Sequence, residues 1–153
     1  MDMRARYTQK GFTLLELLVV VAIIGILSAI IFDYLGSSKE RGADAGVKQN
    51  LVNARAQAEV YFANNATYEG VCNNVSLGIY RQVRAAARAQ KLTTTGLYAD
   101  TTEGSATQEV CHDTEEAYAA WVPLSQGGGM CIDSENNTRT GVPALGANEV
   151  ICP

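Results

Sequence analysis

The feature that most constrains this 153-residue chain is an apolar run near its N-terminus. Residues 17–32 read LLVVVAIIGILSAIIF, and extending the run back to Phe12 gives 21 residues in which Glu16 is the only charged side chain. As a helix rising 1.5 Å per residue, this segment would be about 31 Å long, close to the hydrocarbon thickness of a bilayer. The segment is therefore long enough to span a membrane.

The flanking charges predict how such a segment is oriented. Residues 1–11 carry a net charge of +2, and no Lys or Arg follows until Lys39. By the positive-inside rule, residues 1–11 lie in the cytoplasm and the chain beyond about Ser38 lies outside. The roughly 115 residues that follow are too few to cover a core helix that is apolar all round. An ordinary secretory signal peptide remains open, because a charged region precedes the apolar run.

Glu16 needs a physical reason to stand in this segment. A carboxylate among apolar residues costs several kcal/mol unless it lies near an interface or finds a partner, so it marks function by default. The structural alternative is a capping box, in which Thr13 caps the helix N-terminus and Glu16 bonds back to it. That alternative fits a helix beginning near Phe12, as it would after cleavage behind Gly11.

The residues around Glu16 closely resemble a known processing site. Lys10-Gly11-Phe12-Thr13-Leu14-Leu15-Glu16, followed by LLVVVAIIGIL, is similar to the N-terminus of type IV prepilins and of the related pseudopilins of type II secretion. The resemblance is dense over about residues 10–31. It implies that a membrane-embedded prepilin peptidase cuts after Gly11 and methylates the new amine of Phe12. It also implies that Glu16 meets the N-terminal amine of a neighbouring subunit in a filament core.

The resemblance implies an α+β fold, a long N-terminal helix packed on a small antiparallel sheet. Residues 1–11 would be a cleaved cytoplasmic leader, residues 12–35 a transmembrane and filament-core helix, and residues 36–153 an extracytoplasmic head. The expected partners are other copies of the chain, the peptidase and a pilus assembly machinery, with no cofactor. The expected function is a structural subunit of a type IV pilus. The alternatives are a pseudopilin or minor pilin of a secretion or DNA-uptake apparatus, and a secreted binding domain behind an ordinary signal peptide.

Helical periodicity continues beyond the apolar run. Apolar residues at spacings of three and four predict one helix face, formed by Ala43, Val47, Leu51, Ala54, Ala58 and Phe62. This helix should continue to about Ala63. Residues 77–92 predict a second, shorter helix with a basic stripe of Arg81, Arg84, Arg88 and Lys91. Such a stripe could contact anionic lipid, DNA or an acidic partner, but four cations without interleaved aromatic residues favour a solvated face.

The chain from about Leu92 onward changes to short stretches between turn residues, which is typical of strands. We expect strands at residues 96–98, 118–124, 129–133 and 149–152. Gly127 and Gly128 predict a hairpin between the second and third of these, and residues 134–137 predict the next turn. The pattern indicates a meander of three or four strands on the long helix.

Charge and cysteine content narrow the possible functions. The formal net charge of −4 argues against a general nucleic-acid coat protein. Residues 39–91 carry a net charge of +4 and residues 92–153 carry −8, a layout that fits head-to-tail contact between copies or two solvated faces.

The four cysteines all lie in the part predicted to be outside the membrane, and their even number without CxxC spacing indicates two disulfides. Three pairings are possible. The resemblance to pilins, many of which carry a C-terminal disulfide loop, favours Cys72–Cys111 with Cys131–Cys152.

Two weaker candidates for metal binding lie in the second half of the chain. Cys111, His112 and Asp113, with Glu115 and Glu116, have zinc-ligand chemistry, but one histidine and no second cluster make zinc improbable. Asp133, Glu135 and Asn137 alternate like the start of a calcium loop, and pseudopilins that this chain resembles can bind calcium near their C-terminus. However, Thr138 and Ala144 stand where an EF-hand loop needs Gly and Glu, so we expect a hairpin turn. The sequence presents no set of nucleophile, base and oxyanion donors, which predicts that the protein is not an enzyme.

Overall fold

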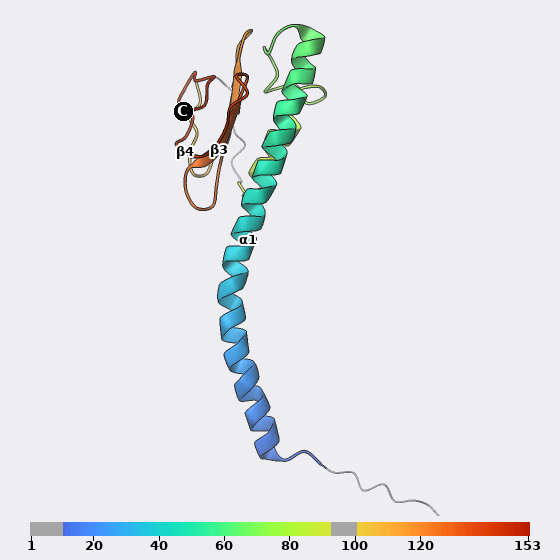
Figure 1. The fold of residues 1–153 in the computed structure, drawn as a ribbon, viewed down its shortest axis with the longest axis vertical. Helices are drawn as coiled ribbons and strands as arrows, with labels where there is room; N and C mark the ends of the chain where they lie inside the picture. The colour runs from blue at the N-terminus through green and yellow to red at the C-terminus, as the bar shows by residue number, and fades with distance from the viewer. Residues whose placement is uncertain (1–10, 93–100) are drawn as a thin grey trace, which may run out of the picture. The chain divides into compact units, whose positions relative to one another are not determined.

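The computed structural model describes residues 11–92 and 101–153 (Figure 1). It contains two helices and four strands: α1 (Leu14–Asn65), α2 (Tyr80–Ala89), β1 (Val110–Asp113), β2 (Tyr118–Pro123), β3 (Gly129–Asp133) and β4 (Thr138–Val142). The chain divides into two units, residues 1–38 and residues 39–153, and the second unit, here called the head, holds both α2 and the sheet. The predicted α+β architecture is confirmed, with a long helix packed on a small antiparallel sheet.

The buried face of α1 follows the predicted periodicity with one shift. Val47, Leu51, Ala54 and Ala58 are fully buried, as the spacing predicts. The next buried position is Tyr61, whereas Phe62 is 38% exposed. A helix of 3.6 residues per turn brings a residue three positions after Ala58 back to the buried face, and a fourth step carries Phe62 to its edge. Phe62 instead stacks on Tyr68, with ring centroids 4.6 Å apart.

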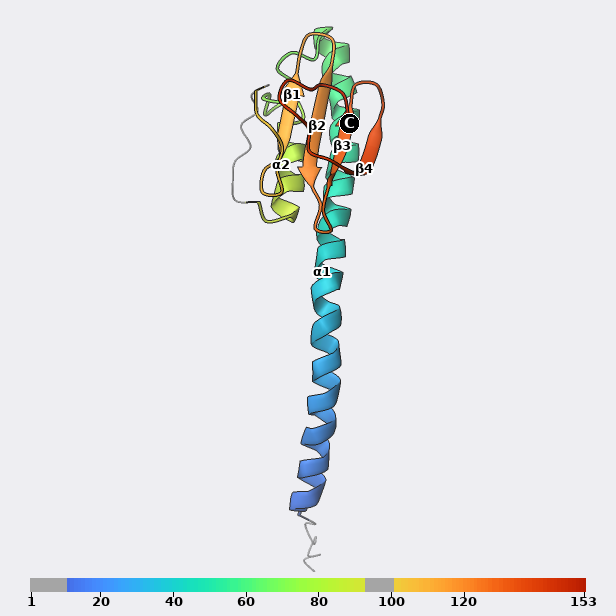
Figure 2. The same ribbon diagram turned by 90° about the vertical axis from the view of Figure 1, so that its left-hand side faces the viewer.

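The sheet is an antiparallel meander in the order β1-β2-β3-β4, seen face-on in Figure 2. The predicted hairpin between residues 118–124 and 129–133 is confirmed, with Ala120 opposite Ile132 and Val122 opposite Met130. Its turn contains two glycines with positive φ, Gly127 at 91° and Gly128 at 63°. Residues with a side chain rarely adopt positive φ values, which explains why glycines occupy this turn.

Three expectations about the secondary structure are corrected. The stretch at residues 149–152 is not a strand, whereas β1 and β4 are strands that the sequence did not indicate. The second helix is also shorter than residues 77–92, because the chain before it folds back on itself. There the N–H of Ile79 donates to the carbonyl of Val71 at 2.9 Å, so the helix begins only at Tyr80. The strand expected at residues 96–98 lies outside the described residues.

The sheet is covered on both faces. Tyr118, Ala120 and Val122 belong to a hydrophobic cluster with α1 and α2. The alternate residues Ala119 and Trp121 belong to a second cluster, which Leu145 and Cys152 of the C-terminal segment complete. Every residue of β2 and β3 is therefore buried, although both strands lie in a head of modest size. Residues 143–153, here called the C-terminal tail, serve as the outer cover of the sheet.

The cysteines form two disulfides, Cys72–Cys111 and Cys131–Cys152, the pairing that the resemblance to pilins favours. The first joins the loop after α1 to β1, and the second ties the C-terminal tail to β3. The linked residues are 39 and 21 positions apart, and closing loops of this length is worth roughly 3 to 4 kcal/mol each in the chain-entropy model. Covalent closure thus stabilises a head with a small core.

We predict that the denatured, non-reduced chain contains no reactive thiol, because both disulfides persist outside a reducing compartment. Alkylation in denaturant followed by intact-mass spectrometry should show no added label, and four labels after reduction. Peptide mapping of the non-reduced digest should recover the two linked pairs. Two or four labels before reduction, or a peptide linking Cys111 to Cys131, would contradict this prediction.

Candidate functional site

The candidate processing and assembly site lies at the start of α1. Gly11 and Phe12 precede the helix, and the Phe12 side chain is 82% exposed. Thr13 and Glu16 form a reciprocal capping box: the N–H and the hydroxyl of Thr13 donate to Glu16 Oε2 at 2.9 and 2.8 Å, and the N–H of Glu16 donates to Thr13 Oγ1 at 3.2 Å. The helix therefore begins directly after the predicted cleavage position, with Glu16 in its first turn.

The apolar part of α1 is exposed among the residues that the structure describes. All large apolar side chains from Leu14 to Leu35 are 46–86% exposed. By length and composition, this stretch is able to cross a membrane. An uncovered apolar surface of this extent requires either lipid or other apolar helices around it.

The proposed calcium candidates are used differently in the structure. Asp133 is completely buried, and its Oδ1 accepts the backbone N–H groups of Glu135 and Asn137 at 3.1 and 2.9 Å. Its Oδ2 accepts the Asn137 side-chain amide and the N–H of Cys152, both at 2.9 Å. Four N–H donors surround this carboxylate, so it organises the turn between β3 and β4 and holds the C-terminal tail. Sequence spacing alone gave no sign of this role.

The residues with zinc-ligand chemistry are likewise engaged in the fold. Cys111 is in a disulfide, and His112 is completely buried. The His112 Nδ1 hydrogen bonds with the carbonyl of Glu149 at 2.8 Å, and its Nε2 with the carbonyl of Thr102 at 2.7 Å. Across residues 11–92 and 101–153, no group of three His, Cys, Asp or Glu side chains is arranged to hold a metal ion.

The basic stripe on α2 is divided between two environments. Arg84 is largely buried and pairs with Glu109, which is completely buried, at 2.5 Å. Arg81, Arg88 and Lys91 are exposed. A buried ion pair of this kind is costly to break by removing one partner, so Arg84 has a structural role that the stripe pattern did not reveal.

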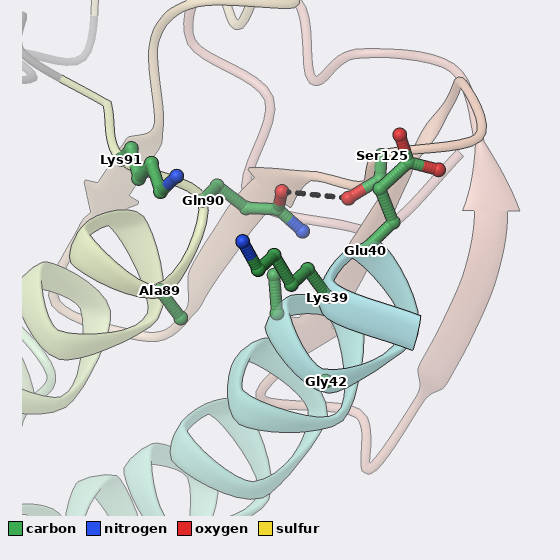
Figure 3. Close-up of a pocket in the computed structure, with 8 residues that line it drawn as sticks. Lys39, Glu40, Gly42, Ala89, Gln90, Lys91 and Ser125 are labelled. Atoms are coloured by element: carbon green, nitrogen blue, oxygen red, sulfur yellow. Dashed lines mark hydrogen bonds between the residues drawn. The ribbon is translucent and has the colours of Figure 1, made fainter. Parts of the chain in front are cut away.

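A groove of about 600 Å³ opens where the C-terminal end of α2 meets the beginning of the head part of α1 (Figure 3). Beside it, Asp44 Oδ1 accepts the Gln90 amide at 2.6 Å and the N–H of Ser125 at 2.9 Å. Partial burial raises the pKa of Asp44, but these bonds outweigh it and hold the pKa below its usual value. The groove is thus built on a bonded, ionised carboxylate.

Comparison with known proteins points to the N-terminal segment. The family described as "prokaryotic N-terminal methylation motif" matches residues 6–32. The chain carries a prepilin-type N-terminus. It is 42% identical over 59 residues to the type IV wide pilus major component PilA4 of Thermus thermophilus, covering 39% of this chain and 45% of that protein. It is 35% identical over 66 residues to the type II secretion system core protein G of Escherichia coli, covering 43% and 46%.

A longer match reaches into the head. The type IV major pilin protein PilA of Myxococcus xanthus is 27% identical over 127 residues, covering 83% of this chain and 50% of that protein. The chain spans half or less of the length of the relatives it matches. No solved structure matches. These relatives are structural pilins and pseudopilins and not enzymes.

We predict that Asp133→Ala destabilises the head by about 2 kcal/mol, because the buried N–H of Cys152 loses its acceptor. The free energy of unfolding of the detergent-solubilised full chain, measured by circular dichroism in urea, tests this. Glu135→Ala is the matched control, since it removes an exposed carboxylate from the same turn and should change stability by no more than about 0.5 kcal/mol. Equal unfolding midpoints for Asp133→Ala and the wild-type chain would disprove the role assigned to Asp133.

Proposed function

We propose that this protein is a structural subunit of a type IV pilus, anchored in the membrane first and assembled into a surface filament afterwards. The observation that carries the proposal is the match to the methylation motif at residues 6–32, most of which forms an apolar helix that is exposed among the described residues. In this proposal a prepilin peptidase removes residues 1–11 and methylates Phe12, residues 12–35 form the filament core, and residues 36–153 form the extracytoplasmic head. Assembly requires a pilus machinery in the membrane.

The proposed role of Glu16 follows from the electrostatics of that core. Cleavage after Gly11 would leave an ammonium group on Phe12, and both this group and the Glu16 carboxylate are poorly solvated among apolar helices. Pairing the carboxylate of one subunit with the amine of its neighbour offsets part of both desolvation costs. The capping box uses only Oε2 of Glu16 in its bonds to Thr13, so Oε1 has no hydrogen-bond partner among the described residues.

A pseudopilin of a type II secretion system is the second candidate, because several relatives are core protein G of such systems. It would form a periplasmic pseudopilus in place of a surface filament. The pilus is preferred because the match to a type IV major pilin extends over 83% of this chain, whereas the match to core protein G of Escherichia coli covers 43%. A secreted binding domain behind an ordinary signal peptide is the third candidate.

The mature N-terminus separates the two pilin-like candidates from the secreted binding domain. We predict that the chain isolated from its native membranes begins at Phe12 and carries one methyl group on its amine. Mass spectrometry of the N-terminal peptide measures both features directly. A mature chain beginning near Lys39 would show signal-peptide cleavage and would disprove the proposed function.

We predict that Glu16→Gln is processed and inserted normally but enters filaments poorly. A glutamine can keep the capping box, whereas the neighbouring ammonium loses its counter-charge at a cost of several kcal/mol per subunit. The yield of sheared filaments, normalised to the membrane-bound pool, should fall by at least about tenfold.

Thr13→Ala is the matched control for this prediction, because it removes the hydroxyl of the capping box and leaves the Glu16 charge in place. We expect that variant to assemble at close to the wild-type yield. Normal filament yield from Glu16→Gln would leave Glu16 as a helix cap only.

A further inference from the structure

Two groups of exposed charges lie at opposite ends of the head, among other exposed charges between them. One end, here called the basic end, carries Lys39, Arg41, Arg88 and Lys91, all exposed. The Gln90–Asp44 hydrogen bond and the close approach of Gly46 to Ala89 bring the C-terminal end of α2 beside the first turns of α1 in the head. Four cations from α1, α2 and the turn after α2 therefore share one end of the head, with Glu40 as the exposed carboxylate among them.

The other end, here called the acidic end, carries Glu69, Glu115 and Glu116, all exposed. The turn between β1 and β2 is fixed there, because the N–H of Tyr68 and the hydroxyl of Thr67 donate to the Glu115 carbonyl at 3.0 and 3.1 Å. No Lys or Arg occurs between Arg55 and Arg81 or between Lys91 and Arg139. The β1–β2 turn and the loop after α1 therefore contain no cation of their own, and Arg55 at this end is bonded to the neighbouring β3–β4 turn.

The two ends lie about one head length apart. Within α1, Asp44 lies at the basic end of the head and Asn65 lies at the acidic end. The 21 helical residues from one to the other span about 32 Å. The sheet runs between the same limits, since the β2–β3 turn meets Asp44 at Ser125 and the β1–β2 turn meets the end of α1 at Tyr68. Opposite charges at opposite ends of a rod-like head are complementary when copies stack end to end.

The basic end also offers a place for the partner to enter. The groove described above is lined by Lys39, Lys91, Gln90 and Ser125, and Figure 3 shows both lysine ammonium groups directed toward Gln90 at its mouth. Its volume of about 600 Å³ is ample for the side chains of one exposed turn. Within the groove, Glu40 is the lining residue with the opposite charge.

We propose that the acidic end of one copy docks on the basic end of the next copy, with the β1–β2 turn and its two glutamates entering the groove between Lys39 and Lys91. This contact rests on the proposed function, since it needs the heads to be aligned along a filament. It adds a second electrostatic contact to the one at Glu16, in the solvated outer layer. Exposed pairs are screened by salt, so the contact weakens as ionic strength rises.

A charge-exchange experiment in the full chain tests the contact. The basic-end reversal, Lys39→Glu with Lys91→Glu, and the acidic-end reversal, Glu115→Lys with Glu116→Lys, should each lower the filament yield by about fivefold. All four changes in one chain should restore the yield to within about twofold of wild type, because the two ends are again complementary. Arg81→Glu, a reversal of an exposed charge outside both ends, should leave the yield unchanged.

Cross-linking gives a second readout that does not depend on yield. A chain with Lys91→Cys and Glu116→Cys should form a ladder of disulfide-linked multimers when its filaments are oxidised, since its other cysteines are already paired. The same chain in dispersed, detergent-solubilised form should stay monomeric. Absence of the ladder in intact filaments would overturn the contact.

The remaining outcomes separate this contact from the proposed function. If the wild-type chain forms filaments and neither reversal lowers the filament yield, the contact is overturned and the pilus assignment stands. The same holds if the chain with all four changes is as defective as the chains with one reversal. Loss on the basic-end reversal alone would point to anionic lipid headgroups as the partner and would also overturn it. A processed wild-type chain that never forms filaments would disprove the proposed function itself.

Discussion

Helix α1 and the sheet pack together because the helix presents a narrow and mostly small apolar face. Val47, Leu51, Ala54 and Ala58 are completely buried, and the alanines leave room for larger side chains such as Tyr118 from the sheet. This contact covers one face of β2 and β3. Because only the other face remains, the short C-terminal tail is enough to cover it. In its first part α1 is apolar on all sides, and in the head it is apolar on one face only. The fold of the head therefore depends on where along α1 this change occurs.

Local patterns predicted the elements whose signal lies in their own residues. The long helix and the β2–β3 hairpin carry periodic apolar residues and a glycine turn, so both were predicted. The edge strand β4 was missed because Thr138–Val142 is largely exposed and polar, and reads as a loop. Residues 149–152 look like a strand because Cys152 and the two residues before it are apolar, but Cys152 packs on a sheet face and the stretch does not pair with an edge.

Some roles of the candidate site residues were likewise predictable from local sequence, and others were not. The capping box was predictable, because Thr13 and Glu16 interact within one helical turn. The roles of Asp133, His112 and Glu109 were not, because most of their partners are backbone groups and Arg84, the partner of Glu109, is distant in the chain. Buried polar side chains of this kind are satisfied by tertiary structure, so no spacing rule identifies them.

The second cluster contains the single tryptophan of the chain. Trp121 is 2% exposed and pairs across the sheet with Cys131, whose disulfide holds the C-terminal tail. Its indole also lies against the backbone of Gly129, where a Cβ atom would overlap the ring. The tryptophan fluorescence of this protein therefore comes from one ring beneath the tail, so its emission reports whether the outer cover is in place.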